Sequence, residues 1–196
     1  MRTRDINKEE IVKQKAIEMI VTQGVEGFGM NRLAKECGIS VATLYIYYSD
    51  KEDLIRKIGI EIGRKLFDKM LDGFSPEMSF KDGLENQWEN RIYFTLNFTQ
   101  EATCFEILKQ STYGDAIIEE ITGDFKQTMS QFILSTIERK ELIPVTFEVF
   151  WSIAYGSLYS LLELHREGKS MSGKPFVFTN ELKNEAFNLV LKALTP

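Results

Sequence analysis

The fold is decided by the stretch Met30-Asn-Arg-Leu-Ala-Lys-Glu-Cys-Gly-Ile-Ser-Val-Ala-Thr-Leu-Tyr-Ile-Tyr-Tyr48. Its first part, Met30 to Cys37, favours a short helix, and Gly38 follows at the point where the chain must turn. Ser40 is a good N-cap for a second short helix over Val41–Tyr47. Two short helices separated by a tight turn are therefore expected here.

The apolar residues of this stretch are spaced so that the two helices can pack together. Ala34 lies where the helices would cross closely, and Ile39 and Leu44 supply apolar contacts between them. This is a helix-turn-helix pattern, in which the second helix can enter the major groove of duplex DNA. An ordinary pair of packed helices has the same pattern, so these residues alone leave both interpretations open.

Helical periodicity also dominates on both sides of this stretch. One helix is expected from Asn7 or Lys8 to Gly24, and another from the acidic segment after Ser49 to about Leu71. Beyond the loop at 73–76, further helices are expected near residues 80–98, 101–110, 115–140, 146–167 and 179–194. The chain is thus predicted to be an all-α protein of about nine helices.

A longer segment that includes the turn, Gly38-Ile-Ser-Val-Ala-Thr-Leu-Tyr-Ile-Tyr-Tyr-Ser-Asp-Lys51-Glu-Asp-Leu54, resembles the signature of the TetR family of transcriptional regulators. That signature reads Gly-Val-Ser-x-Gly-Thr-Leu-Tyr-x-x-Phe, two residues, then Lys-Glu-x-Leu. With the helices before it, the matching region covers about a quarter of the chain. Ala42 replaces the usual Gly, Ile46 a common aromatic, and Gly29 the usual Thr or Ser cap, so no operator sequence is carried over from relatives.

The resemblance implies a cytoplasmic homodimer that binds double-stranded DNA at a palindromic operator. It also implies a helix-turn-helix DNA-binding domain over 1–50, a connecting helix and loop over 51–75, and a helical-bundle body for ligand binding and dimerisation over 76–196. A small, largely apolar effector would release the operator, and most members of the family repress. The alternative is a helical dimeric ligand- or protein-binding module with a degenerate DNA-binding head.

Candidate DNA contacts follow from position in this resemblance. The candidates for base-edge contacts are Val41, Ala42, Thr43, Tyr45 and Ile46. The candidates for phosphate contacts are Asn31, Arg32, Tyr47 and Lys51. Thr43 can donate a hydrogen bond, whereas Val41 and Ile46 can make only apolar contacts, such as with a thymine methyl group. For Tyr45 partial core packing is an open alternative, and for Tyr48 core packing is the preferred one.

Two further sets of residues are candidates in the body. In the family the last two long helices form a four-helix dimer interface, which here would use Phe147, Ala154, Leu158, Leu161, Leu162, Phe187, Val190 and Leu194. The candidates for lining an apolar ligand cavity are Trp88, Tyr93, Phe94, Asn97, Phe105, Tyr113, Phe125, Met129, Trp151 and Tyr155. Residues with this helical spacing can equally form an intramolecular core, so that alternative stays open for both sets.

The charge distribution agrees with a DNA-binding N-terminus. The net charge of the whole chain is −5, but residues 1–66 carry 12 Lys and Arg against 10 Asp and Glu. The remaining residues carry 12 against 19, so the first third alone has an excess of positive charge. This difference is small and supports the motif without deciding the matter.

Other classes of protein find little support in the sequence. The composition is that of an ordinary globular chain, with no apolar run long enough to span a membrane and no signal peptide expected. Two cysteines and one histidine suit neither a disulfide framework nor a metal site, so no metal, cofactor or catalytic residue is predicted. The segment Gly168–Lys174 matches the start of a phosphate-binding loop, but Pro175 stands where Ser or Thr is needed.

Overall fold

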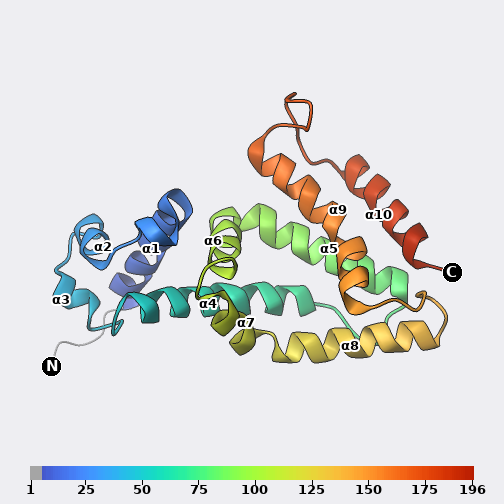
Figure 1. Ribbon diagram of the computed structural model, residues 1–196, viewed down its shortest axis with the longest axis horizontal. Helices are drawn as coiled ribbons and strands as arrows, with labels where there is room; N and C mark the ends of the chain where they lie inside the picture. Colours follow the sequence, from blue (N-terminus) through green and yellow to red (C-terminus); the bar gives the residue numbers. More distant parts are fainter. Residues whose placement is uncertain (1–5) are drawn as a thin grey trace. The chain divides into compact units, whose positions relative to one another are not determined.

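The computed structural model describes residues 6–196, and within them every named element is a helix (Figure 1). The ten helices are α1 (Ile6–Gly27), α2 (Met30–Glu36), α3 (Val41–Leu44), α4 (Lys51–Leu71), α5 (Phe80–Asn97), α6 (Thr99–Lys109), α7 (Gly114–Ile121), α8 (Gly123–Glu138), α9 (Phe147–Glu167) and α10 (Asn180–Leu194). The one β-type pairing in the described chain is an isolated bridge between Lys169 and Pro175. The all-α class predicted from periodicity is confirmed.

The structure has one helix more than the nine expected, because the segment 115–140 forms two helices. The first of them, α7, ends at Ile121, and α8 begins at Gly123. Thr122 between them donates its hydroxyl proton to the carbonyl of Ile118 at 2.8 Å. Thr and Gly are both weak helix formers, and apolar periodicity does not register this break, because both helices keep an apolar face.

Two glycines end regular helix where the sequence predicts it. Gly24 in α1 has φ 70° and ψ 175°, so the regular helix stops there and one further turn continues to Gly27. Gly38 has φ 65°, and the chain turns at it into α3. Residues other than glycine adopt such positive φ values at a cost in free energy, which explains glycine at both points.

Packing divides the chain into two compact units, neither of them continuous in sequence. The head unit contains the described residues up to 68 together with residues 96–123. The body unit contains residues 69–95 and 124–196. The functional division at residues 50 and 75 stays a prediction, and residues 1–5 of its first segment lie outside the described residues.

The core of the head unit is aliphatic, with Leu33, Leu44, Leu54 and other apolar side chains fully buried. Within it, α1 packs against α2 and α6, and α2 packs against α3. Two glycines on α4, Gly59 and Gly63, allow close approach at its contacts with α6 and α7. A Cβ atom added at Gly59 would lie 2.5 Å from the Ile117 side chain, and one at Gly63 would overlap Ile121.

The core of the body unit is rich in aromatic rings. The rings of Phe80, Phe132 and Phe150 pack with centroid distances of 6.2 and 6.4 Å. The fully buried Trp88 on α5 donates its indole N–H to the carbonyl of Ala154 on α9 at 2.8 Å and meets the ring of Phe187 on α10 edge-on. These contacts join α5, α9 and α10 into one packed unit.

Membrane insertion of a helix finds no support in the described part of the chain. None of the helices there combines sufficient length with sufficient apolar character to cross a bilayer.

Candidate nucleic-acid interface

The turn between α2 and α3 is closed by backbone hydrogen bonds. The N–H of Gly38 donates to the carbonyl of Lys35 at 3.1 Å, and the N–H of Ile39 donates to the carbonyl of Ala34 at 3.0 Å. With Gly38 in the left-handed region, this is the usual way of satisfying the last carbonyls of a helix. The turn therefore fixes the direction in which the chain enters α3.

Ser40 caps α3 as the sequence predicts. Its Oγ accepts a hydrogen bond from the backbone N–H of Thr43 at 3.2 Å, and the two hydroxyl groups lie 2.8 Å apart. A side-chain cap matters for a helix of four residues, since such a helix has almost no internal hydrogen bonds of its own. The cap also holds the Thr43 hydroxyl close to the N-terminus of α3.

The helix-turn-helix buries one set of side chains and exposes another. Leu33, Ala34 and Leu44 have less than 3% of their surface exposed, so they hold α2 and α3 together. On the outer side Tyr45 is 52% exposed and Ile46 is 43% exposed. Large apolar side chains at the surface of a charged unit are candidates for contact with a partner. About half of the Tyr45 surface is thus available to a partner, and the other half is covered, so both the base contact and partial core packing remain open for it.

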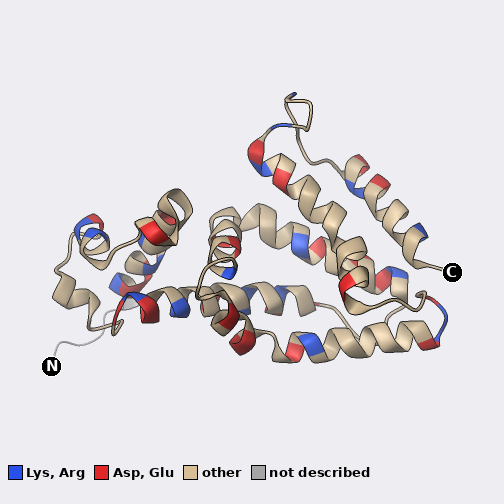
Figure 2. Ribbon diagram, viewed as in Figure 1, with Lys and Arg blue, Asp and Glu red and all other residues tan. Residues whose placement is uncertain are grey.

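The remaining candidate base contacts lie around these two. Ala42 is exposed, and Val41 and Thr43 are half-buried. Figure 2 shows that α3 carries no charged residue, whereas α2 carries both signs. Any recognition by α3 itself must therefore come from apolar contacts and from hydroxyl groups.

The four candidate phosphate contacts differ in exposure. Asn31 and Arg32 are exposed in the first turn of α2. Tyr47 is only 6% exposed and packs beside Tyr48, with their ring centroids 6.4 Å apart. Tyr48 is buried, which agrees with the core role predicted for it.

Lys51 is held in place by the last turn of α1 and the residue that follows it. Its Nζ donates to the backbone carbonyl of Val25 at 3.0 Å and lies 5.9 Å from the ring centroid of Phe28. An ammonium group has three donors, so one bond to Val25 leaves others for a phosphate oxygen. The structure thus gives Lys51 a fixed position compatible with the predicted contact.

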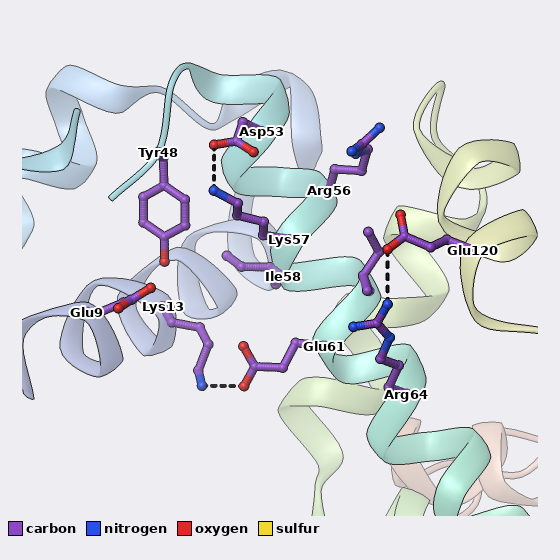
Figure 3. Close-up of a pocket in the computed structure, with 11 residues that line it drawn as sticks. Glu9, Lys13, Tyr48, Asp53, Arg56, Lys57, Ile58, Glu61, Arg64 and Glu120 are labelled. Atoms are coloured by element: carbon purple, nitrogen blue, oxygen red, sulfur yellow. Dashed lines mark hydrogen bonds and ion pairs between the residues drawn. The ribbon is translucent and has the colours of Figure 1, made fainter. Parts of the chain in front are cut away.

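A polar cavity of about 460 Å³ lies elsewhere in the head unit, and sequence reasoning did not find it. Its walls come mainly from α1 and α4, with Tyr48 and Glu120 added (Figure 3). Three ion pairs lie in its lining: Lys13 with Glu61 at 2.6 Å, Lys57 with Asp53 at 2.9 Å, and Arg64 with Glu120 at 3.0 Å. A cavity lined by balanced charges does not suit the apolar effector expected from the resemblance.

Asp53 lines this cavity and also binds the residue Ser49 just before α4. Its carboxylate accepts from Lys57 and from the backbone N–H of Ser49 at 2.9 Å. The hydrogen bond from Lys57 and then that from Ser49 keep the pKa of Asp53 below its usual value.

The candidate ligand residues are divided between the two units. Asn97, Phe105 and Tyr113 belong to the head unit, and the other seven belong to the body unit. Tyr93 is 48% exposed and faces Lys69, whose Nζ lies 4.6 Å from its ring centroid. In the body unit the structure brings three of the predicted residues together: Trp151 lies 6.3 Å from Phe125 and 4.8 Å from Tyr155, measured between ring centroids.

Arg91 lies among these three rings, and sequence reasoning missed it. Its guanidinium carbon is 4.0 Å from the ring centroid of Tyr155 and 5.3 Å from that of Trp151. Only 1% of Arg91 is exposed. The signal was present in the sequence, since Arg91 stands three residues after Trp88 and three before Phe94 on one helix, the spacing of an apolar face.

Most of the candidate dimer residues are covered by their own chain. The six that are buried inside the body unit are Ala154, Leu158, Leu162, Phe187, Val190 and Leu194. These side chains form the core between α9, α10 and their neighbours, which is the alternative that periodicity left open. Of the other two candidates, Phe147 is 47% exposed and Leu161 is half-buried. The further exposed large apolar residues of the two helices are Val149, Tyr159 and Leu189.

No metal centre is found in the described part of the chain, where no three His, Cys, Asp or Glu side chains gather closely enough to hold an ion. Cys37 and Cys104 are both free thiols. Burial raises the pKa of Cys104 to about 12, which leaves this thiol protonated and poorly reactive at neutral pH.

Comparison with known proteins identifies the N-terminal segment. Residues 7–58 match the model of the bacterial regulatory proteins of the tetR family. An HTH-type transcriptional regulator of Staphylococcus aureus strain bovine RF122 is 41% identical over 54 residues, which are 28% of this chain and 29% of the relative. An uncharacterized HTH-type transcriptional regulator of Bacillus subtilis is 29% identical over 153 residues, 74% of this chain and 51% of the relative. The chain therefore spans about half, or less, of the curated relatives it matches.

Solved structures show that the fold extends over the whole chain. A TetR family transcription regulator from Marinobacter aquaeolei superposes with a TM-score of 0.81 at 24% identity, covering 99% of this chain and 98% of the other. A TetR-family transcriptional regulator from Haemophilus influenzae gives a TM-score of 0.77 at 13% identity, with complete coverage of both chains. At these identities the likeness establishes the fold alone.

Proposed function

The chain belongs, through residues 7–58, to the tetR family of bacterial regulatory proteins, and from this premise we propose that it is a DNA-binding transcriptional regulator. It binds a palindromic operator in double-stranded DNA as a homodimer and represses transcription. A small, largely apolar molecule that binds the body unit releases it from the operator.

The observation that carries this proposal is the exposed surface of α3 and of the two residues that follow it. Ala42 is exposed on α3, Tyr45 and Ile46 present large apolar side chains directly after its end, and Ser40 caps its N-terminus. Such side chains can contact thymine methyl groups in a major groove, and the Thr43 hydroxyl can bond to a base edge or a phosphate. In this proposal the uncharged α3 recognises the DNA bases, and residues outside α3 bind the DNA phosphates.

Those neighbours supply the phosphate contacts. Arg32 and Asn31 are exposed at the start of α2, and Lys51 is fixed at the start of α4. With these few phosphate contacts one head binds DNA weakly, and a dimer has twice as many contacts. The exposed Val149 and Tyr159 on α9 and Leu189 on α10 offer the apolar surface for pairing two chains.

Selection of bound duplexes from a random pool tests this function. The expected result is an enriched palindromic site whose affinity falls steeply as salt rises, because phosphate binding releases counterions. Lys51→Ala should weaken binding to all sequences by about tenfold, and Thr43→Ala should change the preference among them. Lys126→Ala, an exposed lysine of the body unit, is the matched control and should change neither.

Two results would overturn the proposal. One is a pool from which no sequence is enriched at low salt. The other is an enriched site to which Lys51→Ala and Thr43→Ala both bind as the parent protein does. A dimer that enriches no DNA but retains a ligand or a protein would instead establish the alternative of a degenerate head.

A further inference from the structure

The body unit contains a buried positive charge without a counter-ion. Arg91 on α5 is 1% exposed, and no Asp or Glu of the described residues pairs with its guanidinium group. Arginine keeps its charge in proteins, so burial does not neutralise it. Buried charges in folded proteins are normally paired, because removing an ion from water is costly.

The hydrogen bonds that Arg91 makes leave one edge of the guanidinium open. Its Nη1 donates to the side-chain oxygen of Gln87 at 2.5 Å and to the Gln87 carbonyl at 3.4 Å. Its Nε and Nη2 are buried and have no hydrogen-bond partner. These two nitrogens form the side of the guanidinium that binds both oxygens of a carboxylate in a forked pair.

A second orphaned group lies on the ring stacked against Arg91. Tyr155 is fully buried, and its hydroxyl has no hydrogen-bond partner. Burial raises the pKa of Tyr155 to about 12, although the charge of Arg91 opposes this shift, so the hydroxyl keeps its proton at neutral pH. In the described residues, three of the five buried side-chain polar atoms that lack partners belong to Arg91 and Tyr155.

The surroundings of the guanidinium group are aromatic. Tyr155, Trp151 and Phe125 lie within 6 Å of the guanidinium carbon, measured to the ring centroids. Of these rings only that of Trp151 is partly exposed. Cation–π contacts satisfy the faces of the guanidinium, but they provide no acceptor for the N–H groups at its edge.

We infer that Arg91 is the anchor for the carboxylate group of a singly charged, apolar organic acid, which is the effector of the proposed regulator. The forked pair supplies the two missing acceptors, and one negative charge balances the one buried positive charge. A phosphate dianion would leave an excess negative charge in an aromatic environment. The regulatory part of this inference depends on the proposed function, whereas the binding site itself does not.

The test measures thermal unfolding of the full-length protein with acetate, benzoate, hexanoate and decanoate, each against its primary amide at equal ionic strength. At least one carboxylate should raise the unfolding temperature in a saturable way, and its amide should not. Arg91→Met and Arg91→Lys should each weaken binding at least tenfold, because the first loses the charge and the second the fork. Arg166→Met, which removes an exposed arginine of α9, is the matched control and should bind as the parent does.

Unfolding without ligand gives a second readout that needs no knowledge of the acid. Arg91→Met should unfold at a higher temperature than the parent, because it removes an unpaired buried charge. A lower unfolding temperature than that of Arg166→Met would show that Arg91 serves the fold alone and would overturn the inference. The same holds if no carboxylate binds, if the Arg91 variants bind as the parent does, or if phenyl phosphate binds more tightly than benzoate.

Operator binding separates this inference from the proposed function. Carboxylate binding that depends on Arg91 but leaves DNA affinity unchanged would support the site and contradict the effector role. If the protein binds DNA but none of the acids, the carboxylate site at Arg91 is contradicted and the proposed function as a DNA-binding regulator is not.

Discussion

In the head unit the cations Lys13, Lys57 and Arg64 lie at a surface cavity, each within 3.0 Å of a carboxylate oxygen. In the body unit Arg91 lies almost fully buried against aromatic rings, and two of its nitrogens, Nε and Nη2, have no hydrogen-bond partner. Water screens the first group, so its pairs contribute little to stability and can be exchanged for other partners. Arg91 is not screened by water, so the aromatic side chains around it restrict which partner it can bind. This contrast agrees with the two proposals above, in which the head unit binds DNA in water and the body unit binds an organic anion away from water.

The largest expected effect concerns the single polar partner that Arg91 does have. Gln87 is fully buried, donates to the Met70 carbonyl and accepts from Arg91. Gln87→Leu should lower the free energy of unfolding by about 3 kcal/mol, since it leaves a buried charge with even fewer partners. Chemical denaturation measures this loss.

A double-mutant cycle identifies the source of that loss. In an Arg91→Met background the same Gln87→Leu change should lower the free energy of unfolding by about 1 kcal/mol. Equal losses in both backgrounds would show that Gln87 acts through Met70 alone, and the contrast between the units would then lose its main support.

A smaller effect is expected from the two helix caps, one in each unit. Ser40 accepts from the backbone N–H of Thr43 at the start of α3, and Thr179 accepts from that of Leu182 at the start of α10. Ser40→Ala and Thr179→Ala should each lower the free energy of unfolding by about 1 kcal/mol. Only Ser40→Ala should also weaken DNA binding, as measured by fluorescence anisotropy. Equal effects of the two changes on DNA affinity would remove α3 as the recognition element.

The smallest effect is the acid dependence of stability. The pKa of Asp53 in the head is lowered by Lys57 and Ser49, and that of Glu141 in the body by Arg139 and by the N–H of Phe80. A lowered pKa stabilises the fold above the unfolded-state pKa, roughly 4, and this contribution is lost as pH falls through the folded-state value. Asp53→Asn and Glu141→Gln should each reduce the loss of stability between about pH 5 and pH 2. Both carboxylates lie at the surface and are partly exposed, so water screens them and each change should stay below about 1 kcal/mol. Unfolding curves measured across that range check both variants. If the free energy of unfolding falls with pH as it does in the parent, these hydrogen bonds are not a source of the acid dependence.

Local signals in the sequence were sufficient for the helix-turn-helix and the turns beside it. Gly24 and Gly38 mark positions that need positive φ, and Ser40 marks a cap, because each acts through its own backbone or that of its near neighbours. The break at Thr122 was missed because an apolar stripe can continue across one non-helical residue. The placement of DNA contacts rests on the motif and stays a prediction, although the exposure of Tyr45 and Ile46 agrees with it.

In the body unit local signals do not predict which apolar side chains are covered by the same chain. Periodicity indicates that Ala154, Leu158 and Phe187 face something apolar, but it cannot say whether that is the same chain or a second copy. The structure buries all three within the body unit and exposes Val149, Tyr159 and Leu189 instead. The burial of Arg91 likewise depends on α8 and α9, which follow it in the chain by more than 30 residues.

The sequence by itself determined the all-α class, the helix-turn-helix and its caps, because these depend on interactions between residues a few positions apart. Only the tertiary structure decided which apolar faces are covered and which polar groups are left without partners. Burial and hydrogen-bond satisfaction depend on all the elements that surround a side chain, and those elements come from distant parts of the sequence.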